Sequence, residues 1–146
     1  MPADGTPSVD DLNKSLGMVR RIEMNPEGRA SIEYEASLAM CHSGGVVQGG
    51  FITGWIDAAM AHAVIAMAGA DTVPMSLELK VSFFAPTRPG RVIAEAWIER
   101  KGRTMCFAEG RLLDLSGKVL AKASSTIQLA SRERVFEAAK AATAAS

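Results

Sequence analysis

One carboxylate, Asp57, lies inside a long and otherwise apolar stretch of the chain, QGGFITGWIDAAMAHAVIAMAGA, which runs from Gln48 to Ala70. An ionised carboxylate in apolar surroundings is unfavourable unless it is paired or neutralised. Such a group can serve as a general base or a nucleophile, because its surroundings set its reactivity. The alternative is a structural role, in which Asp57 pairs with an arginine or caps an interrupted helix.

The start of the same stretch offers a second group for that chemistry. Gly49 and Gly50 stand where a helix would begin, so their backbone N–H groups would be free and at the positive end of the helix dipole. Such groups can hold a carbonyl oxygen while Asp57, two turns later, activates water or attacks the carbon directly. Thr53 precedes Asp57 by one turn on the same face, and its hydroxyl could hydrogen-bond the carboxylate.

Other reactive side chains lack a productive spacing. The stretch GGVVQGGF does not end in the Lys-Ser/Thr pair of a phosphate-binding loop. Cys41 and His42 are neighbours, and adjacent side chains in an extended chain point in opposite directions, which argues against a Cys/His catalytic pair. The cysteines and histidines lack the spacing of metal ligands, so we expect no metal site. His62 is expected to be a packed or partly exposed histidine.

Composition indicates one globular domain. The 146 residues fit a single domain spanning 1–146. Lys and Arg together number 16, as do Asp and Glu, so we expect neither a nucleic-acid nor a membrane partner. Two cysteines and a polar N-terminal stretch favour a cytoplasmic location. The apolar stretch is long enough for a membrane span, but its polar residues favour a buried core helix.

The elements that must position Asp57 follow from the spacing of apolar residues. Residues 1–17 form an N-terminal segment with a short helix, which begins after Ser8 and stops at Gly17. Two strands follow, and the proline and glycine of residues 25–28 suit a type I turn between them. The apolar run is rich in Ala, Met and Ile without strict alternation, which favours one long helix.

A series of strand-like stretches follows that helix. In SLELKVSFF, apolar residues alternate with polar ones, which predicts that Leu77, Leu79, Val81 and Phe83 share one face. Residues 91–100, 103–115 and 118–129 are further strands, and residues 131–146 form a helix or a tail. The element order predicts an α+β fold in which a curved antiparallel sheet wraps around one long apolar central helix.

From about residue 42 to residue 126, the sequence resembles the hotdog-fold acyl-CoA thioesterases of the phenylacetate-degradation (PaaI-like) group. That family shows an asparagine, then His-Gly-Gly, then an acidic residue nine positions after the histidine. Here Gln48-Gly49-Gly50 stands at the His-Gly-Gly place, and Asp57 follows Gln48 by nine positions. His42 stands where the family has its asparagine, so the chain departs from the pattern at two positions.

The resemblance implies a role for each matched residue. Asp57 would be the catalytic carboxylate, and Gly49 would supply the N–H that polarises the carbonyl oxygen. His42 would help to hold the thioester or water, and Gln48 keeps hydrogen-bonding capacity at the place of the family's histidine. Ser76 would contact the nucleophile or water from the neighbouring subunit.

The resemblance also implies the substrate and the assembly. The substrate would be an aryl- or fatty-acyl-CoA thioester, hydrolysed to free acid and coenzyme A without a cofactor. The chain would form a homodimer or homotetramer with active sites between subunits, and sheet extension would cover exposed strand edges. The expected contacts with coenzyme A are Phe83, Arg100, Lys101, Gly102, Arg103 and Thr104.

Two other functions are compatible with the sequence. A dehydratase or hydratase of the same fold would pair a histidine with an acid, as His42 could do with Asp57. A non-hydrolytic acyl-CoA-binding protein is the other alternative. A DNA-binding regulator would usually add a basic helix pair, which neither terminus shows.

Overall fold

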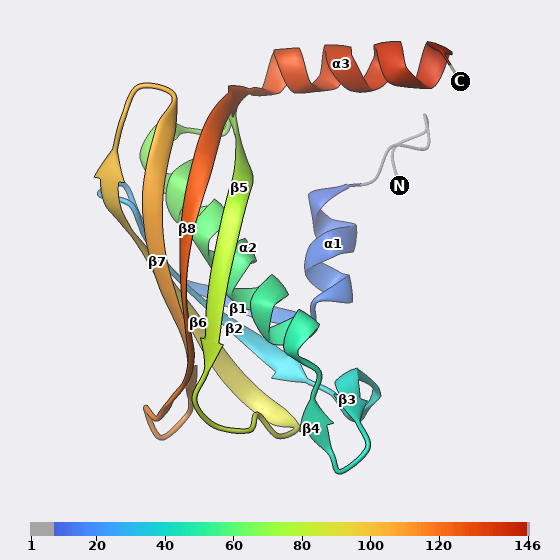
Figure 1. Ribbon diagram of the computed structural model, residues 1–146, viewed down its shortest axis with the longest axis vertical. Coiled ribbons are helices and arrows are strands. Elements are labelled where there is room, and N and C mark those ends of the chain that lie inside the picture. Colours follow the sequence, from blue (N-terminus) through green and yellow to red (C-terminus); the bar gives the residue numbers. More distant parts are fainter. Residues whose placement is uncertain (1–7, 146) are drawn as a thin grey trace.

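The computed structural model describes residues 8–145 (Figure 1). The expected course of residues 1–7 lies outside the described residues. The elements in chain order are α1 (Val9–Ser15), β1 (Met18–Asn25), β2 (Arg29–Ala36), a 3-10 turn (Leu38–Met40), β3 (Cys41–His42), β4 (Val46–Val47), α2 (Gly49–Ala68), β5 (Thr72–Phe83), β6 (Gly90–Lys101), β7 (Met105–Asp114), β8 (Val119–Ser131) and α3 (Arg132–Ala145).

Six strands form one antiparallel sheet in the order β1-β2-β6-β7-β8-β5. The sheet curves around α2, and the short pair β3-β4 lies near the start of that helix (Figure 1). β1 and β5 are therefore the two edges of the large sheet. The predicted α+β hotdog fold, with a curved sheet around one central helix, is confirmed.

Helix α2 forms the centre of the core. Gln48 caps its start, and the helix ends at Gly69, whose φ of 97° lies in the left-handed region that favours glycine. By length and composition α2 would also suit a membrane span, but the core helix of a globular protein meets the same criterion. Its residues Trp55, Ile56 and Met60 are fully buried, as a core helix requires.

Close packing fixes α2 against the concave face of the sheet. The rings of Tyr34 in β2 and Trp55 stack with their centres 5.8 Å apart. At Gly110 in β7, an added Cβ would lie 2.7 Å from the side chain of Ile56 and 3.1 Å from that of Met60. The helix can approach β7 this closely because a glycine stands at the contact.

Strand β5 contains an irregularity that the alternating sequence does not predict. Ser76 and Glu78 pair with successive residues of β8, which leaves Leu77 as an extra, bulged residue. Ser76 consequently faces α2, as Leu79 and Val81 do, whereas Leu77 is 55% exposed. The prediction that Leu77 shares the apolar face of this strand is wrong.

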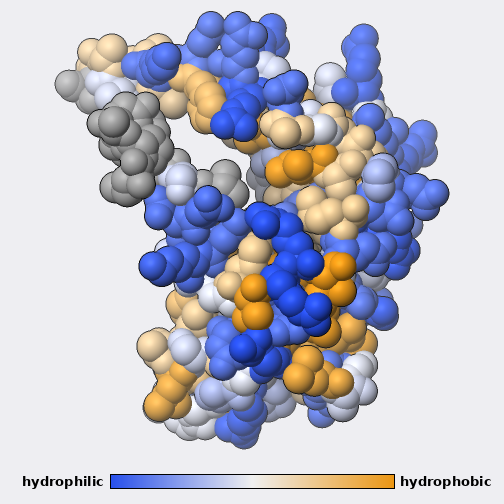
Figure 2. Space-filling view, turned by 180° about the vertical axis from the view of Figure 1, so that it is seen from behind, coloured by the Kyte–Doolittle hydropathy of each residue, from blue (hydrophilic) through white to orange (hydrophobic). Residues whose placement is uncertain are grey.

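The two terminal helices lie outside the sheet. The side chain of Ser8 accepts a hydrogen bond from the backbone N–H of Asp11 and so caps α1. The indole N–H of Trp55 donates a 2.7 Å bond to the carbonyl oxygen of Leu16, which ties the end of α1 to α2. Helix α3 has no buried residue and extends away from the sheet (Figure 1). Seen from behind, it projects at the top of the molecule with hydrophilic and hydrophobic residues both on its surface (Figure 2).

Candidate active site

The carboxylate of Asp57 and the hydroxyl of Ser76 meet where α2 faces the edge strand β5. The hydroxyl of Ser76 donates a 2.7 Å hydrogen bond to Oδ1 of Asp57. The bulge at Leu77 turns Ser76 toward the helix and so makes this contact possible. The resemblance places the serine on a neighbouring subunit, whereas in the structure the serine that reaches Asp57 belongs to the same chain.

In the described chain, Asp57 neither pairs with an arginine nor caps an interrupted helix, which are the two forms of a purely structural role. Within residues 8–145, none of the ion pairs involves Asp57, and α2 is continuous around it. The side chain is half-buried rather than sealed in the core. The predicted bond from Thr53 is wrong, because the Thr53 hydroxyl donates to the carbonyl oxygen of Gly49 at 2.8 Å.

The start of α2 leaves one backbone N–H group available. The side-chain oxygen of Gln48 accepts a 2.8 Å hydrogen bond from the N–H of Gly50, and the Gln48 carbonyl accepts one from Phe51. The N–H of Gly49 stands in the first turn, where a helix supplies no acceptor. An added Cβ at Gly49 would lie 3.1 Å from the ring of Phe83, so the ring lies close against this glycine. The capping role of Gln48 was not predicted.

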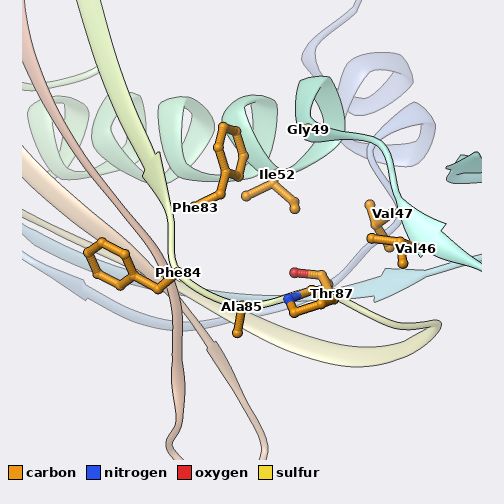
Figure 3. A pocket seen from close by; sticks show the side chains of 9 residues that line it. Val46, Val47, Gly49, Ile52, Phe83, Phe84, Ala85 and Thr87 are labelled. Carbon is orange, nitrogen blue, oxygen red and sulfur yellow. The ribbon is translucent and has the colours of Figure 1, made fainter.

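A cavity of about 430 Å³ opens beside the start of α2 (Figure 3). Phe83, one of the expected contacts with coenzyme A, is one of its walls, and neither Asp57 nor Ser76 lines it. Its lining residues are Val46, Val47, Gly49, Ile52, Phe83, Phe84, Ala85, Pro86 and Thr87.

The two groups expected to act on one carbonyl are well separated within a chain. Eight residues at a rise of 1.5 Å each place Gly49 and Asp57 about 12 Å apart along the axis of α2. A carbonyl oxygen hydrogen-bonded at Gly49 would keep its carbon within a few Å of that N–H group, beyond the reach of Asp57. The expectation that one chain holds both groups around a single carbonyl is wrong.

The two histidines occupy different surroundings. His42 in β3 is exposed, and its Nδ1 lies 2.8 Å from the carbonyl oxygen of Ser43. His62 is buried in α2 with Nδ1 2.7 Å from the carbonyl oxygen of Ala58, and burial lowers its pKa. The prediction of a packed His62 is confirmed. In the part of the chain that the structure describes, no group of three or more His, Cys, Asp or Glu side chains could hold a metal ion.

The basic turn between β6 and β7 lies at the opposite end of the sheet from the β5–β6 segment that lines the cavity (Figure 1). Arg100, Lys101 and Arg103 take part in no ion pair among the described residues. By contrast, Arg91 pairs with Glu33 at 2.6 Å. The basic side chains of this turn are therefore free to bind an anion. Within one chain, however, they lie far from the cavity at the start of α2.

The backbone of the basic turn is fixed by two hydrogen bonds. The N–H of Gly102 donates to the carbonyl oxygen of Met105 at 2.7 Å, and an added Cβ at Gly102 would lie 2.9 Å from that oxygen. The carbonyl of Thr104 accepts a 2.8 Å bond from Leu129 in β8. The turn thus presents its basic side chains from a defined loop.

Comparison with known proteins shows which family this chain belongs to. Residues 44–121, more than half of the chain, match the model of the thioesterase superfamily. The chain belongs to that superfamily. A relative from Saccharolobus solfataricus, named "Putative esterase", is 35% identical over 98 residues, which cover 66% of this chain and 69% of that protein. Hydrolase activity of the thioesterase type follows from these matches.

Two solved structures that are similar to this chain agree with the PaaI-like resemblance. A protein from Ralstonia eutropha JMP134, described as a "putative thioesterase, phenylacetic acid degradation-related protein", is 30% identical, with a TM-score of 0.74 over 86% of this chain and 94% of that chain. The PaaI protein of E. coli is 20% identical, with a TM-score of 0.76 over 84% and 86% of the two chains, and this likeness shows the fold.

Proposed function

We propose that this thioesterase-superfamily chain hydrolyses an acyl-CoA thioester to a free acid and coenzyme A, at a site formed by two copies. The observation that carries the proposal is the pair Asp57 and Ser76, a half-buried carboxylate that receives a hydroxyl hydrogen bond at the open edge of the sheet. The available N–H of Gly49 lies about 12 Å away along α2, so a second chain is needed to bring the two groups together.

The edge strand β5 supports an assembly of two chains. Its outer edge has no partner strand in the described part of the chain, and it exposes Met75 and Leu77. A long unpaired edge that exposes apolar side chains is often covered in native proteins. A two-fold pairing along β5 would run the two α2 helices in opposite directions, so the Gly49 end of one would approach Asp57 of the other. The resulting unit is a homodimer, or half of a homotetramer.

The proposed reaction uses Asp57 as a general base. A water proton moves to the carboxylate, the water oxygen bonds to the thioester carbon, the carbon–sulfur bond breaks, and the coenzyme A thiolate takes up a proton. The Ser76 hydroxyl positions the carboxylate, and the partner chain's Gly49 N–H holds the negative oxygen. Direct attack by Asp57 is the variant in which the carboxylate acts as nucleophile, through an anhydride that water then hydrolyses.

The basic turn would bind the phosphates of coenzyme A. Arg100, Lys101 and Arg103 are free of ion pairs among residues 8–145, and phosphate accepts strong charge-assisted hydrogen bonds. The two-fold arrangement would offer this turn to the partner's cavity. The aromatic wall at Phe83 suits an aryl or fatty acyl group, so the proposal gives Phe83 to the acyl group rather than to coenzyme A, where the resemblance puts it. The free thiols of Cys41 and Cys106 agree with a cytoplasmic location.

The alternatives have weaker support. A hydratase would pair a histidine with the acid, but within one described chain His42 bonds to Ser43 and Asp57 to Ser76, so such a pair would have to form between two chains. His42 instead lies in the β3-β4 hairpin that precedes α2, where it could approach the substrate. A non-hydrolytic binding protein would bind acyl-CoA in the same way but would not hydrolyse it, and the following experiment measures this hydrolysis.

The test is release of free thiol from a panel of aryl- and fatty-acyl-CoA esters. Asp57→Asn should lower kcat by about a hundredfold or more while binding of coenzyme A is retained. Asp71→Asn, a change of the same kind at an exposed aspartate, is the matched control and should keep full activity. Tight binding without thiol release from any ester would contradict the proposal, as would normal turnover by Asp57→Asn.

A further inference from the structure

One hydroxyl group near the start of α2 is buried without a partner. Thr87 is 1% exposed, and its Oγ1 has no hydrogen-bond partner within the described chain. The backbone of the residue is held in place, because its carbonyl oxygen accepts a 2.8 Å bond from the N–H of Val47. Buried hydroxyl groups are normally hydrogen-bonded, so an unpaired one calls for a partner outside the chain.

The position of this hydroxyl points to a ligand. Thr87 lines the 430 Å³ cavity and also a neighbouring cavity of about 290 Å³. In Figure 3, its oxygen points from the loop into the space bordered by Ile52 and Phe83. The other residues around the larger cavity carry apolar side chains or none. A single fixed polar group in an apolar pocket is the usual means by which a pocket orients and selects its ligand.

We propose that Thr87 determines acyl specificity, by hydrogen-bonding an oxygen atom that the acyl chain carries beyond the thioester. The inference rests on the proposed function, because Gly49 lines the same cavity and a carbonyl bound there would direct the acyl chain among these walls. The favoured substrates are then hydroxyacyl or oxoacyl thioesters. An unsubstituted chain of the same length would leave the Thr87 hydroxyl unpaired and would bind less well.

The test uses binding, so that it does not depend on turnover. S-hexyl-CoA, S-(3-hydroxyhexyl)-CoA and S-(6-hydroxyhexyl)-CoA are thioethers that cannot be hydrolysed, and calorimetry gives the affinity of each. Wild type should bind at least one hydroxylated analogue about tenfold more tightly than S-hexyl-CoA. Thr87→Val, which has the same shape without the hydroxyl, should abolish this preference, and Thr87→Ser should retain it.

A second measurement separates selection of a ligand from an internal structural role. In the ligand-free protein, Thr87→Val should raise Tm, because it removes an unpaired buried hydroxyl; a lower Tm would show that the group is already paired and would overturn the inference. A preference that survives in Thr87→Val, or wild type that binds no analogue or favours S-hexyl-CoA, would overturn it as well. A Thr87-dependent preference without hydrolysis of any ester would contradict the proposed function alone.

Discussion

The two halves of the candidate site differ in how completely one chain builds them. At the start of α2, a capped helix end, the ring of Phe83 and the loop at Thr87 border an open cavity within a single chain. Halfway along α2, Asp57 is held by Ser76 but stands half-buried beside a strand edge that no other strand of residues 8–145 covers. One region therefore holds a cavity within a single chain, whereas we propose that the other meets a second chain. The reaction would need both.

The helix start can be tested by removing a single N–H group. Gly49→Pro deletes this donor at the first helical position, which the proline backbone suits, and the extended backbone of Gln48 tolerates a following proline. We expect kcat to fall about a hundredfold or more, as for other lost oxyanion donors. Gly49→Ala adds a Cβ but keeps the N–H, so it is the matched control and should lose much less. Equal losses in both variants would assign the effect to crowding against Phe83.

The carboxylate region should be less sensitive to the loss of its positioning hydroxyl. Ser76→Ala removes the bond to Asp57, and hydrogen bonds to charged groups contribute about 1.5–3 kcal/mol, so kcat should fall about tenfold to a hundredfold. KM should change little, since the bond does not involve the substrate. Ser82→Ala, on the same strand, is the control. Unchanged kcat in Ser76→Ala would show that the bond to Asp57 does not position the base.

The basic turn should affect binding more than catalysis. Arg103→Ala should raise KM for an acyl-CoA by up to about tenfold, with kcat nearly unchanged, because a phosphate contact is lost. The effect should shrink at high salt, which screens exposed charges. A truncated thioester that lacks the nucleotide serves as the control substrate, and its KM should be the same for wild type and Arg103→Ala. An equal rise in KM for both substrates would contradict the assignment of this turn to the phosphates of coenzyme A.

The smallest expected effect concerns stability rather than activity. Burial lowers the pKa of His62, so the unfolded chain binds a proton more readily than the folded chain as pH falls below about 6.5. This difference should make Tm fall modestly between pH 7 and pH 5. His62→Gln removes the titrating group and should flatten that part of the profile. A wild-type profile as flat as that of the variant would contradict this account of His62.

The sequence predicts the fold well because its signals are local. The apolar run that becomes α2, the alternation in the later strands and the glycine at 69 each act through neighbouring residues. The missed features depend on contacts between distant segments. The bulge at Leu77 and the cavity beside Thr87 arise only when β5, β8 and α2 are packed together. Without the bulge, the alternation of the sequence places Ser76 on the wrong face of β5.

The central claim, that each active site combines Asp57 of one chain with Gly49 of another, is tested most directly by mixing two inactive variants. Asp57→Asn and Gly49→Pro chains, co-expressed with different tags, would form mixed dimers in which one of the two sites keeps both groups. The account predicts that purified mixed protein recovers up to about half of wild-type activity per dimer. Activity no higher than that of the parent variants would contradict it.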